Sequence, residues 1–391
     1  MKNKHNVMSD MISQAVNRMP LSGIRAYFEF LGDDKNVISL AVGQPDFETP
    51  INIVKAASES MLNGHTGYTS NYGLIELREH LSNHIESLYD IKYDPNKEML
   101  LTSGVSEALD IAVRAIIDPG DEVIVPEPAY VAYKPVILLA GGKYIPIPTY
   151  IENDFMVDPE AIEEQITEKT KAILLGYPCN PTGGVMSKEK LLKIAEIAEK
   201  HDLIIIADEL YDRLVYDIEH VCFAALPNMK KRTILLGGFS KSYAMTGWRL
   251  GYIGAQAEIL EAIMKIHQYV MMSAPTAAQY AGIEAISNGE NEIEMMKSEY
   301  NKRRQFVVSE LQKIGFKVSD PQGAFYVFPE VKSLTNKDGN EFAQALLKDQ
   351  KVAVVPGDAF GESGKNHVRI CYAASMPQLI EAMARIEKFV S

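Results

Sequence analysis

The middle of the chain alternates between short apolar runs and stretches in which apolar residues recur at helical spacing. The runs lack the period-two alternation of a half-exposed strand, which is typical of strands buried on both faces. Strands are predicted at residues 99–102, 122–125, 144–147, 171–175, 203–207 and 233–236, and helices between them include 106–117, 130–139 and 188–200. This order predicts an α/β fold with a mostly parallel sheet flanked by helices.

The pattern changes after about residue 255, where longer helical stretches at 257–270, 277–288 and 292–313 precede two strand candidates at 325–328 and 352–355. These elements predict a smaller α+β domain near the C-terminus. A helical segment at 9–31, interrupted at Pro20, is followed by the turn Gly43-Gln44-Pro45-Asp46. We therefore expect an N-terminal arm at residues 1–49 that packs on the small domain, a large domain at 50–290 and a small domain at 291–391.

Composition narrows the possible functions. The chain has 391 residues, enough for two domains, and its 52 acidic and 39 basic side chains give a net charge of −13, which argues against a nucleic-acid partner. Its apolar runs reach five or six residues, whereas a membrane span needs about 20. Three scattered cysteines and an N-terminus without an apolar signal segment indicate a cytoplasmic protein. No metal site is expected, because His80 and His84 lack a third ligand.

Candidate binding residues follow the predicted strands, because ligands of open α/β sheets bind beyond the carboxyl ends of the strands. Gly104, Val105 and Ser106 follow the first strand and open a helix, whose free N–H groups suit a phosphate. A simple helix cap at Ser106 fits the same pattern. Asn180 lies in an Asn-Pro-Thr-Gly turn after the strand at 171–175, and such a turn by itself is ordinary turn chemistry.

Two charged residues are predicted to be partly buried. Asp208, with Tyr211 close behind it, ends the strand at 203–207. A carboxylate at the tip of a buried strand needs a cation, either in a structural ion pair or on a protonated heterocycle. Arg369 lies in a strand-like stretch near the C-terminus and needs a carboxylate in the same way, either from the protein or from a ligand.

Lys241 is the sharpest local signal. It follows the strand at 233–236 among small residues that include Ser240, whereas most lysines lie on solvated faces. Desolvation lowers the pKa of a lysine and frees its amine to form a Schiff base. Arg249 follows eight residues later, near enough to return to the same site and pair with an anion.

These segments together resemble the class I/II aminotransferases, which are pyridoxal 5′-phosphate enzymes of fold type I. The stretch from Ser240 to Gly251, SKSYAMTGWRLG, is similar to the lysine-attachment motif of that family. The resemblance extends from Gly43 to Arg369, and the stretches 139–150 and 352–361 look most like archaeal and bacterial aromatic and aspartate aminotransferases. It implies a sheet of the seven-stranded type and a smaller α+β domain.

The resemblance also implies residue roles. Lys241 would bind the cofactor covalently and then carry the proton between the substrate Cα and the cofactor C4′, while Asp208 would keep the ring nitrogen protonated. Tyr211 and Asn180 would hydrogen-bond the ring oxygen O3′, and Tyr130 would stack on the ring. The phosphate would be held by Gly104, Val105, Ser106, Ser240 and Arg249.

Substrate and assembly follow from the same resemblance. Arg369 would bind the α-carboxylate of an L-amino acid, with Asn180 and the Gly43 backbone nearby. Tyr68 matches a tyrosine that each subunit contributes to its neighbour's cofactor site, which implies an obligatory homodimer with shared active sites. Some aspartate-specific relatives have a lysine where Ser106 stands, so the serine weakens an aspartate assignment.

The leading hypothesis is an aminotransferase that moves an amino group from an L-amino acid, aromatic or broad in range, to the 2-oxo acid 2-oxoglutarate by a ping-pong mechanism. Transamination of aspartate or another amino acid, and a C–S β-lyase reaction that uses the same lysine and aspartate, remain open. A regulatory protein of this fold would need a DNA-binding module, for which the residues before Gly43 leave too little room and positive charge. A nicotinamide dehydrogenase is excluded because no G-x-G-x-x-G follows a predicted strand.

Overall fold

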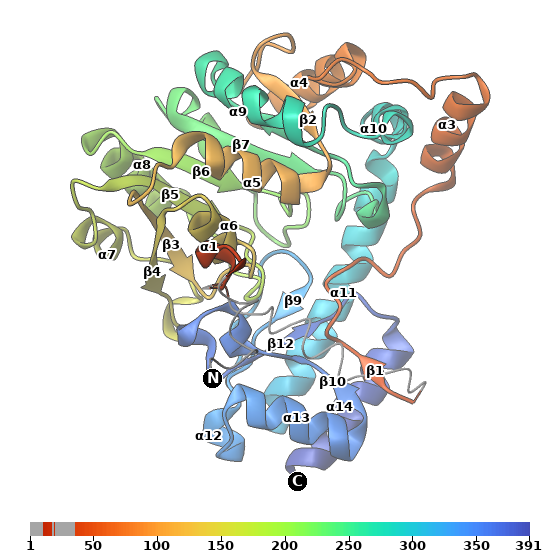
Figure 1. Ribbon diagram of the computed structural model, residues 1–391. Helices are drawn as coiled ribbons and strands as arrows, with labels where there is room; N and C mark the ends of the chain where they lie inside the picture. Colours follow the sequence, from red (N-terminus) through yellow and green to blue (C-terminus); the bar gives the residue numbers. More distant parts are fainter. Residues whose placement is uncertain (1–10, 18, 20–35) are drawn as a thin grey trace, which may run out of the picture.

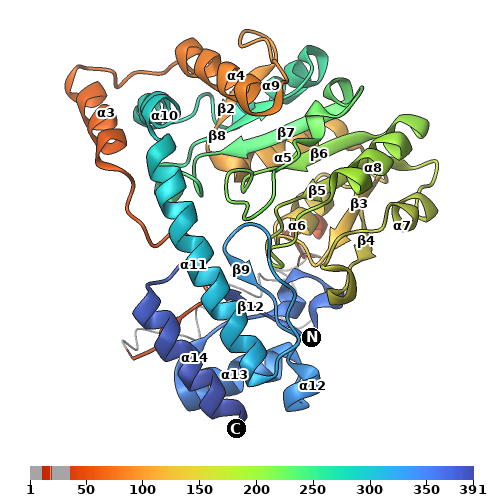
Figure 2. The same cartoon turned by 180° about the vertical axis from the view of Figure 1, so that it is seen from behind.

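A computed structural model describes residues 11–17, 19 and 36–391 of the chain. It has two lobes, a large one built on a wide sheet and a small one that holds the C-terminus (Figure 1). The helix α11 (Glu290–Ile314) runs from the large lobe into the small one, as the view from behind shows clearly (Figure 2). No helix among the described residues is long and apolar enough to cross a membrane.

The large lobe contains a seven-stranded sheet in the order β2-β8-β7-β6-β5-β3-β4. Only β8 runs antiparallel to its neighbours, and the strands from β7 to β4 are parallel. Strands β2, β3, β6 and β7 are buried along almost their whole length and β5 over its middle four residues, as predicted from their continuous apolar runs. The strands are β2 (Met99–Thr102), β3 (Glu122–Glu127), β4 (Lys143–Pro148), β5 (Thr170–Gly176), β6 (Ile204–Asp208), β7 (Thr233–Gly238) and β8 (Gly251–Gly254).

Helices cover both faces of this sheet. On one face α5 (Gly104–Ile116), α6 (Tyr133–Leu139) and α9 (Ala257–Val270) pack on alternate strand residues such as Leu174 and Ile206. The other face, which carries the intervening residues such as Ile173 and Ile205, is covered by α3 (Ile51–Leu62), α4 (Ile75–Tyr89), α7 (Pro159–Glu164), α8 (Lys188–Lys200) and α10 (Thr276–Asn288). The predicted α/β architecture with a mostly parallel sheet is confirmed.

The small lobe is an α+β unit with short strands. β11 (Val355–Pro356), β12 (Val368–Cys371) and β9 (Tyr326–Val327) form an antiparallel sheet in that order. β1 (Ile38–Ser39) pairs in parallel with β10 (Val352–Ala353), so an N-terminal segment is built into this lobe. Helices α12 (Lys332–Thr335), α13 (Gly339–Gln350) and α14 (Met376–Val390) surround these strands together with α11.

The structure differs from the sequence predictions at several elements. β8 was not predicted, and the strand expected at 352–355 divides into β10 and β11, which pair with different partners. The helix expected at 130–139 begins only at Tyr133. Most of the helical segment predicted at 9–31 lies outside the described residues; its described part, α1 (Gln14–Asn17), contacts α6 of the large lobe. Short 3₁₀ turns connect several of these elements, at 151–153, 223–225, 230–232, 246–248, 357–360 and 362–364.

Candidate active site

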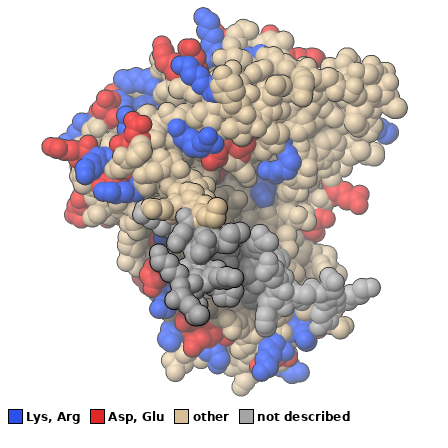
Figure 3. Space-filling view, in the orientation of Figure 1, with Lys and Arg blue, Asp and Glu red and all other residues tan. Residues whose placement is uncertain are grey.

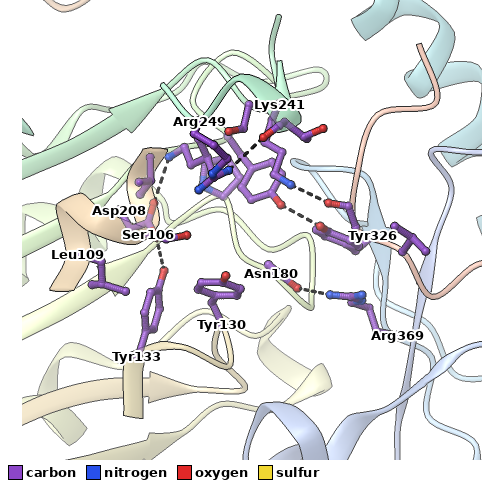
Figure 4. A pocket seen from close by; sticks show the side chains of 18 of the residues that line it. Ser106, Leu109, Tyr130, Tyr133, Asn180, Asp208, Lys241, Arg249, Tyr326 and Arg369 are labelled. Carbon is purple, nitrogen blue, oxygen red and sulfur yellow. Dashed lines mark hydrogen bonds between the residues drawn. The ribbon is translucent and has the colours of Figure 1, made fainter. Parts of the chain in front are cut away.

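A cavity of about 270 Å³ lies at the carboxyl ends of the parallel strands, between the two lobes. Eleven of the thirteen residues singled out in the sequence line it, and the other two, Gly104 and Tyr68, do not. Figure 4 shows that the labelled side chains converge on it from both lobes. The lining residues from the sequence are Gly43, Val105, Ser106, Tyr130, Asn180, Asp208, Tyr211, Ser240, Lys241, Arg249 and Arg369.

Lys241 lies three residues beyond the end of β7. Its Nζ donates a hydrogen bond of 2.6 Å to the carbonyl oxygen of Gly43 and lies 5.8 Å from the ring centres of Tyr211 and Phe325. Burial lowers the pKa of the ammonium group to about 8, and the positive charges of nearby arginines act in the same direction. An amine with this pKa is available as a nucleophile and proton carrier near neutral pH.

Asp208 is the last residue of β6, and its carboxylate is buried. The Tyr133 hydroxyl donates to Oδ2 at 2.8 Å, and the Leu210 N–H donates to Oδ1 at 3.3 Å. Burial raises the pKa of this carboxyl to about 6. Within the described part of the chain Asp208 forms no salt bridge, so of the two alternatives the structural ion pair is absent there and the carboxylate remains available to a cationic ligand.

The start of α5 lies at one end of the cavity, beside Arg249. Gly104 has φ of +75°, and a Cβ at this position would lie 2.4 Å from Nη2 of Arg249. Only glycine therefore lets the guanidinium lie against the helix start. Arg249 itself has a left-handed backbone, with φ of +53°, and its Nη1 donates to the Thr246 carbonyl at 3.0 Å. A guanidinium beside free helical N–H groups suits a phosphate.

Arg369 projects from β12 at the small-lobe side. Its Nη1 donates to Oδ1 of Asn180 at 2.9 Å, and its Nη2 donates to the Ala41 carbonyl. The guanidinium lies 4.6 Å from the ring centre of Tyr326 and 4.9 Å from that of Phe360. Its buried Nε has no hydrogen-bond partner among the described residues, and no carboxylate there pairs with it. Arg369 therefore has the spare donor capacity that a substrate carboxylate requires.

Two tyrosines in the cavity wall were not singled out in the sequence. The Tyr326 hydroxyl lies 2.8 Å from that of Tyr211, which joins the two lobes. A Cβ on Gly43 would lie 2.3 Å from the Tyr326 hydroxyl oxygen, so residue 43 has to be glycine for this contact to form. Tyr133 stands edge-on to Tyr130, with ring centres 5.6 Å apart. No local motif marks either residue, since both act through contacts between segments far apart in sequence.

Tyr68 lies outside this cavity, and its side chain is 84% exposed. Its neighbours fix the loop that carries it: the Thr276 hydroxyl donates to the Gly67 carbonyl at 2.8 Å, and the Gln279 side chain donates to Thr69 at 3.0 Å. The tyrosine is therefore presented outward on a well-anchored loop. Among residues 11–17, 19 and 36–391 no cluster of three or more side chains is arranged to bind a metal ion.

Comparison with known proteins gives consistent matches over nearly the whole chain. A family model described as aminotransferase class I and II matches residues 35–386. The protein named "Putative aminotransferase YugH" of Bacillus subtilis is 47% identical over 98% of this chain and 99% of its own length. An aspartate aminotransferase of Pyrococcus abyssi is 43% identical over 94% and 95%. The crystal structure of an aromatic aminotransferase from Pyrococcus horikoshii is 39% identical, with a TM-score of 0.89 over 93% of this chain and 98% of that one.

The cavity and these matches point to the same conclusion. The fold, the lysine at the sheet edge and the arginine of the small lobe occur in a chain that aligns end to end with aminotransferases. The chain belongs to the class I and II aminotransferases, a family of pyridoxal-phosphate enzymes.

Proposed function

We propose that this enzyme transfers an amino group from an L-amino acid, aromatic or broad in range, to 2-oxoglutarate by a ping-pong mechanism with pyridoxal 5′-phosphate. One observation carries the proposal: a single cavity holds Lys241, Asp208, Arg249 and Arg369, each without a salt-bridge partner in the described chain. Four such groups fit a ligand with an electrophilic carbon, a basic ring nitrogen and two anionic groups.

The residues present fit this cofactor. The phosphate would be held by Arg249, Ser240 and the amides of Val105 and Ser106. The absence of a side chain at Gly104 lets the Arg249 guanidinium lie beside these amides. Asp208 would face the ring nitrogen, and Tyr130 would lie against the ring. Tyr211 and Asn180 would contact O3′. The bound cofactor would supply an electron sink for the substrate Cα carbanion.

The chain's own residues would then position the substrate and move its proton. Lys241 Nζ, with a pKa of about 8, can accept the proton from the substrate Cα and return it at neutral pH. Arg369 would bind the α-carboxylate through its guanidinium, which Tyr326 and Asn180 already orient. Since Arg369 and Lys241 lie on different lobes, the α-carboxylate and the reacting carbon would be held from opposite sides.

A homodimer with shared active sites is part of the proposal. Large apolar side chains lie exposed on α3, on the Tyr68 loop, and at the end of α9 and just after it: Ile51, Met61, Leu62, Tyr68, Tyr269, Val270, Met271 and Met272. Figure 3 shows a broad area with few charged side chains over α3 and α10. Such an area supports burial against a second copy, with Tyr68 reaching the partner's cofactor phosphate.

We further propose a cytoplasmic location, which the three unpaired cysteines support. We also propose the division into an arm at residues 1–49, a large domain at 50–290 and a small domain at 291–391. The division is supported by the start of the connecting helix α11 at Glu290 and by the pairing of β1 with β10.

The experiment that tests this function mixes purified enzyme, loaded with pyridoxal phosphate, with one amino acid at a time and no acceptor. Absorbance should follow conversion to the pyridoxamine form, and the rank order of rates should place aromatic donors ahead of aspartate. Addition of 2-oxoglutarate should then restore the original absorbance. A wild-type protein that binds no pyridoxal phosphate would sink the proposal. Release of pyruvate from cystathionine without an acceptor would favour the β-lyase alternative.

A further inference from the structure

We infer that Tyr133 is a positioning residue for Asp208: its hydroxyl orients the carboxylate and lowers its basicity, so that a proton shared with the cofactor ring nitrogen stays on the ring. The inference rests on the proposed cofactor role of Asp208. It concerns a residue that the proposed function does not otherwise use.

The contact is built from two elements of the large lobe. Tyr133 is the first residue of α6 and is buried, and its hydroxyl reaches Oδ2 of Asp208 at 2.8 Å (Figure 4). Gly176, the last residue of β5, pairs with Asp208 across the sheet. A Cβ on Gly176 would lie 2.2 Å from the Tyr133 hydroxyl oxygen and 3.0 Å from Cζ.

Glycine is therefore needed at position 176 to leave room for the Tyr133 side chain, and not because of its backbone conformation. Gly176 is not among the residues with left-handed φ, so an alanine would suit its backbone. An alanine would leave no room for the phenol beside the carboxylate. The contact therefore depends on two residues: Tyr133, which donates to Asp208, and Gly176, which has no side chain to block it.

The direction of the hydrogen bond follows from the chemistry of the pair. Burial and the nearby carboxylate raise the pKa of the Tyr133 phenol well above its ordinary value, so the phenol keeps its proton and donates it. The Leu210 N–H donates to the other carboxylate oxygen. Each oxygen of Asp208 thus has one protein donor and keeps acceptor capacity for a ligand.

The two donors oppose the effect of burial. Burial alone favours the protonated carboxyl, and both hydrogen bonds lower its pKa towards the ordinary value. Loss of the phenol hydroxyl would leave Oδ2 without its protein donor, and the carboxyl would take up a proton at a higher pH. A neutral carboxyl cannot hold a protonated ring nitrogen by charge.

Other titratable groups face Asp208 from neighbouring elements. They are Lys241 after β7, Glu209 next in the chain, Tyr130 before α6 and Cys179 after β5. All of them remain in a Tyr133→Phe variant, so a change in the titration of Asp208 can be assigned to the lost hydroxyl.

The test measures the dissociation constant of pyridoxal phosphate from the full-length apoenzyme between pH 5 and 9. In wild type, affinity should fall at low pH as Asp208 becomes protonated. Tyr133→Phe should move that midpoint up by about one pH unit, since one hydrogen bond to a charged group is worth roughly that much. In turnover, kcat should fall about tenfold while KM for the amino donor stays within about twofold.

A double mutant separates positioning from packing. If Tyr133 acts through Asp208, Tyr133→Phe should change pyridoxal phosphate affinity little in an Asp208→Asn background. An unshifted midpoint in the single variant, or an equal loss of affinity in both backgrounds, would overturn the inference. A wild type that binds no cofactor defeats the proposed function and this inference together, whereas a wild type with an Asp208-dependent midpoint that Tyr133→Phe leaves in place defeats this inference alone.

Gly176→Ala provides a second variant that keeps the tyrosine. Its methyl group should displace the phenol and shift the midpoint in the same direction. Gly237→Ala is the matched control. A Cβ on Gly237, in β7, would lie 2.3 Å from the hydroxyl of Tyr252 on the neighbouring strand β8, and this pair does not contact Asp208. It should lower thermal stability comparably and leave the midpoint unchanged. A midpoint shift in Gly237→Ala as large as that in Gly176→Ala would contradict the assignment.

Discussion

The two walls of the cavity are built in different ways. On the large-lobe side Asp208 is the last residue of a buried parallel strand and Lys241 lies three residues beyond another, so a short local motif places each group. On the small-lobe side Arg369 is held by the Ala41 carbonyl, 328 residues away in sequence, and by Asn180. The large-lobe wall, proposed to bind the cofactor and called the cofactor wall below, is therefore encoded locally. The small-lobe wall, proposed to bind the substrate and called the substrate wall, depends on contacts between distant segments.

This difference predicts where substitutions act. A change in the cofactor wall should remove the chemistry for every substrate, because that wall carries the groups that we propose to react. A change in the substrate wall should affect the binding of the amino acid and leave the cofactor in place. Substitutions at Lys241 and Arg369 should separate the two walls, whereas substitutions at His367, Asp338 and Ser187 should act on the stability of the lobes.

Lys241→Ala should have the largest effect. The variant lacks the amine that we propose as both the covalent cofactor ligand and the proton carrier, so transamination should fall by about four orders of magnitude or more. Single-turnover absorbance with an amino acid measures this loss. Lys193→Ala, on the exposed surface of α8, is the control and should retain wild-type rates. Normal turnover by Lys241→Ala would refute the assignment.

Arg369→Leu should raise KM for the amino donor about 100-fold, because the variant would lose the two charge-assisted hydrogen bonds that we propose to the α-carboxylate. Binding of pyridoxal phosphate, followed by fluorescence titration, should change by less than about threefold. Arg369→Lys keeps the charge without the two-pronged geometry and should fall between wild type and Leu. If cofactor binding is lost instead, the arginine holds the lobes together and the two walls are not separable.

His367→Leu tests whether a buried histidine of the small lobe makes the free energy of unfolding depend on pH. His367 is buried, stacks on Phe328 with ring centres 5.0 Å apart, and neither ring nitrogen has a hydrogen-bond partner among the described residues. Burial lowers the pKa of this histidine to about 4. Below pH 6.5 the unfolded chain therefore binds a proton that the folded chain does not.

The sign of the pH effect follows from that difference. The contribution of His367 should be constant above pH 6.5, and wild type should lose about 3 kcal/mol of unfolding free energy as the pH falls from 6.5 to 4. His367→Leu should lack this loss and should also be about 1 kcal/mol more stable at pH 7. Urea denaturation across this pH range measures both. Parallel pH curves for the two proteins would show that the site does not titrate as inferred.

Helix caps should give the smallest effects, and they compare the lobes directly. Asp338 caps α13 in the small lobe by accepting from two backbone N–H groups, at 2.9 and 3.1 Å. Ser187 caps α8 in the large lobe through one bond of 3.3 Å. Asp338→Ala should cost about 1 kcal/mol of unfolding free energy, Ser187→Ala less, and both should keep kcat within about twofold. A changed kcat in either variant would mean that the caps influence the cavity.

The same division explains how far sequence alone could predict the molecule. Asp208 and Lys241 could be found because a charged residue at the end of an apolar run is locally unusual. Tyr133 could not be found, since it is one of 19 tyrosines and its contact with Asp208 depends on a glycine in a distant strand. β8 was not predicted because the stretch Gly251–Gly254 is short and glycine-rich. It forms a strand because it pairs with β2 on one side and β7 on the other. The strands β9 to β11 have two residues each, which is too short for a hydrophobic pattern to predict them individually.

The parallel pairing of β1 with β10 has a consequence for how the protein is made. Ile38 and Ser39 leave the ribosome early, but their partners Val352 and Ala353 are synthesised 314 residues later. At roughly 5–20 residues per second, the N-terminal segment waits on the order of 15–60 s before its strand can form. During that interval the large lobe can fold, while Ala41 and Gly43 lack the surface against which they are fixed. Completion of the proposed substrate wall is thus among the last events of biosynthesis. A chain truncated before residue 352 would lack β10 and therefore the partner of β1, so this wall would stay incomplete even if the large lobe folded.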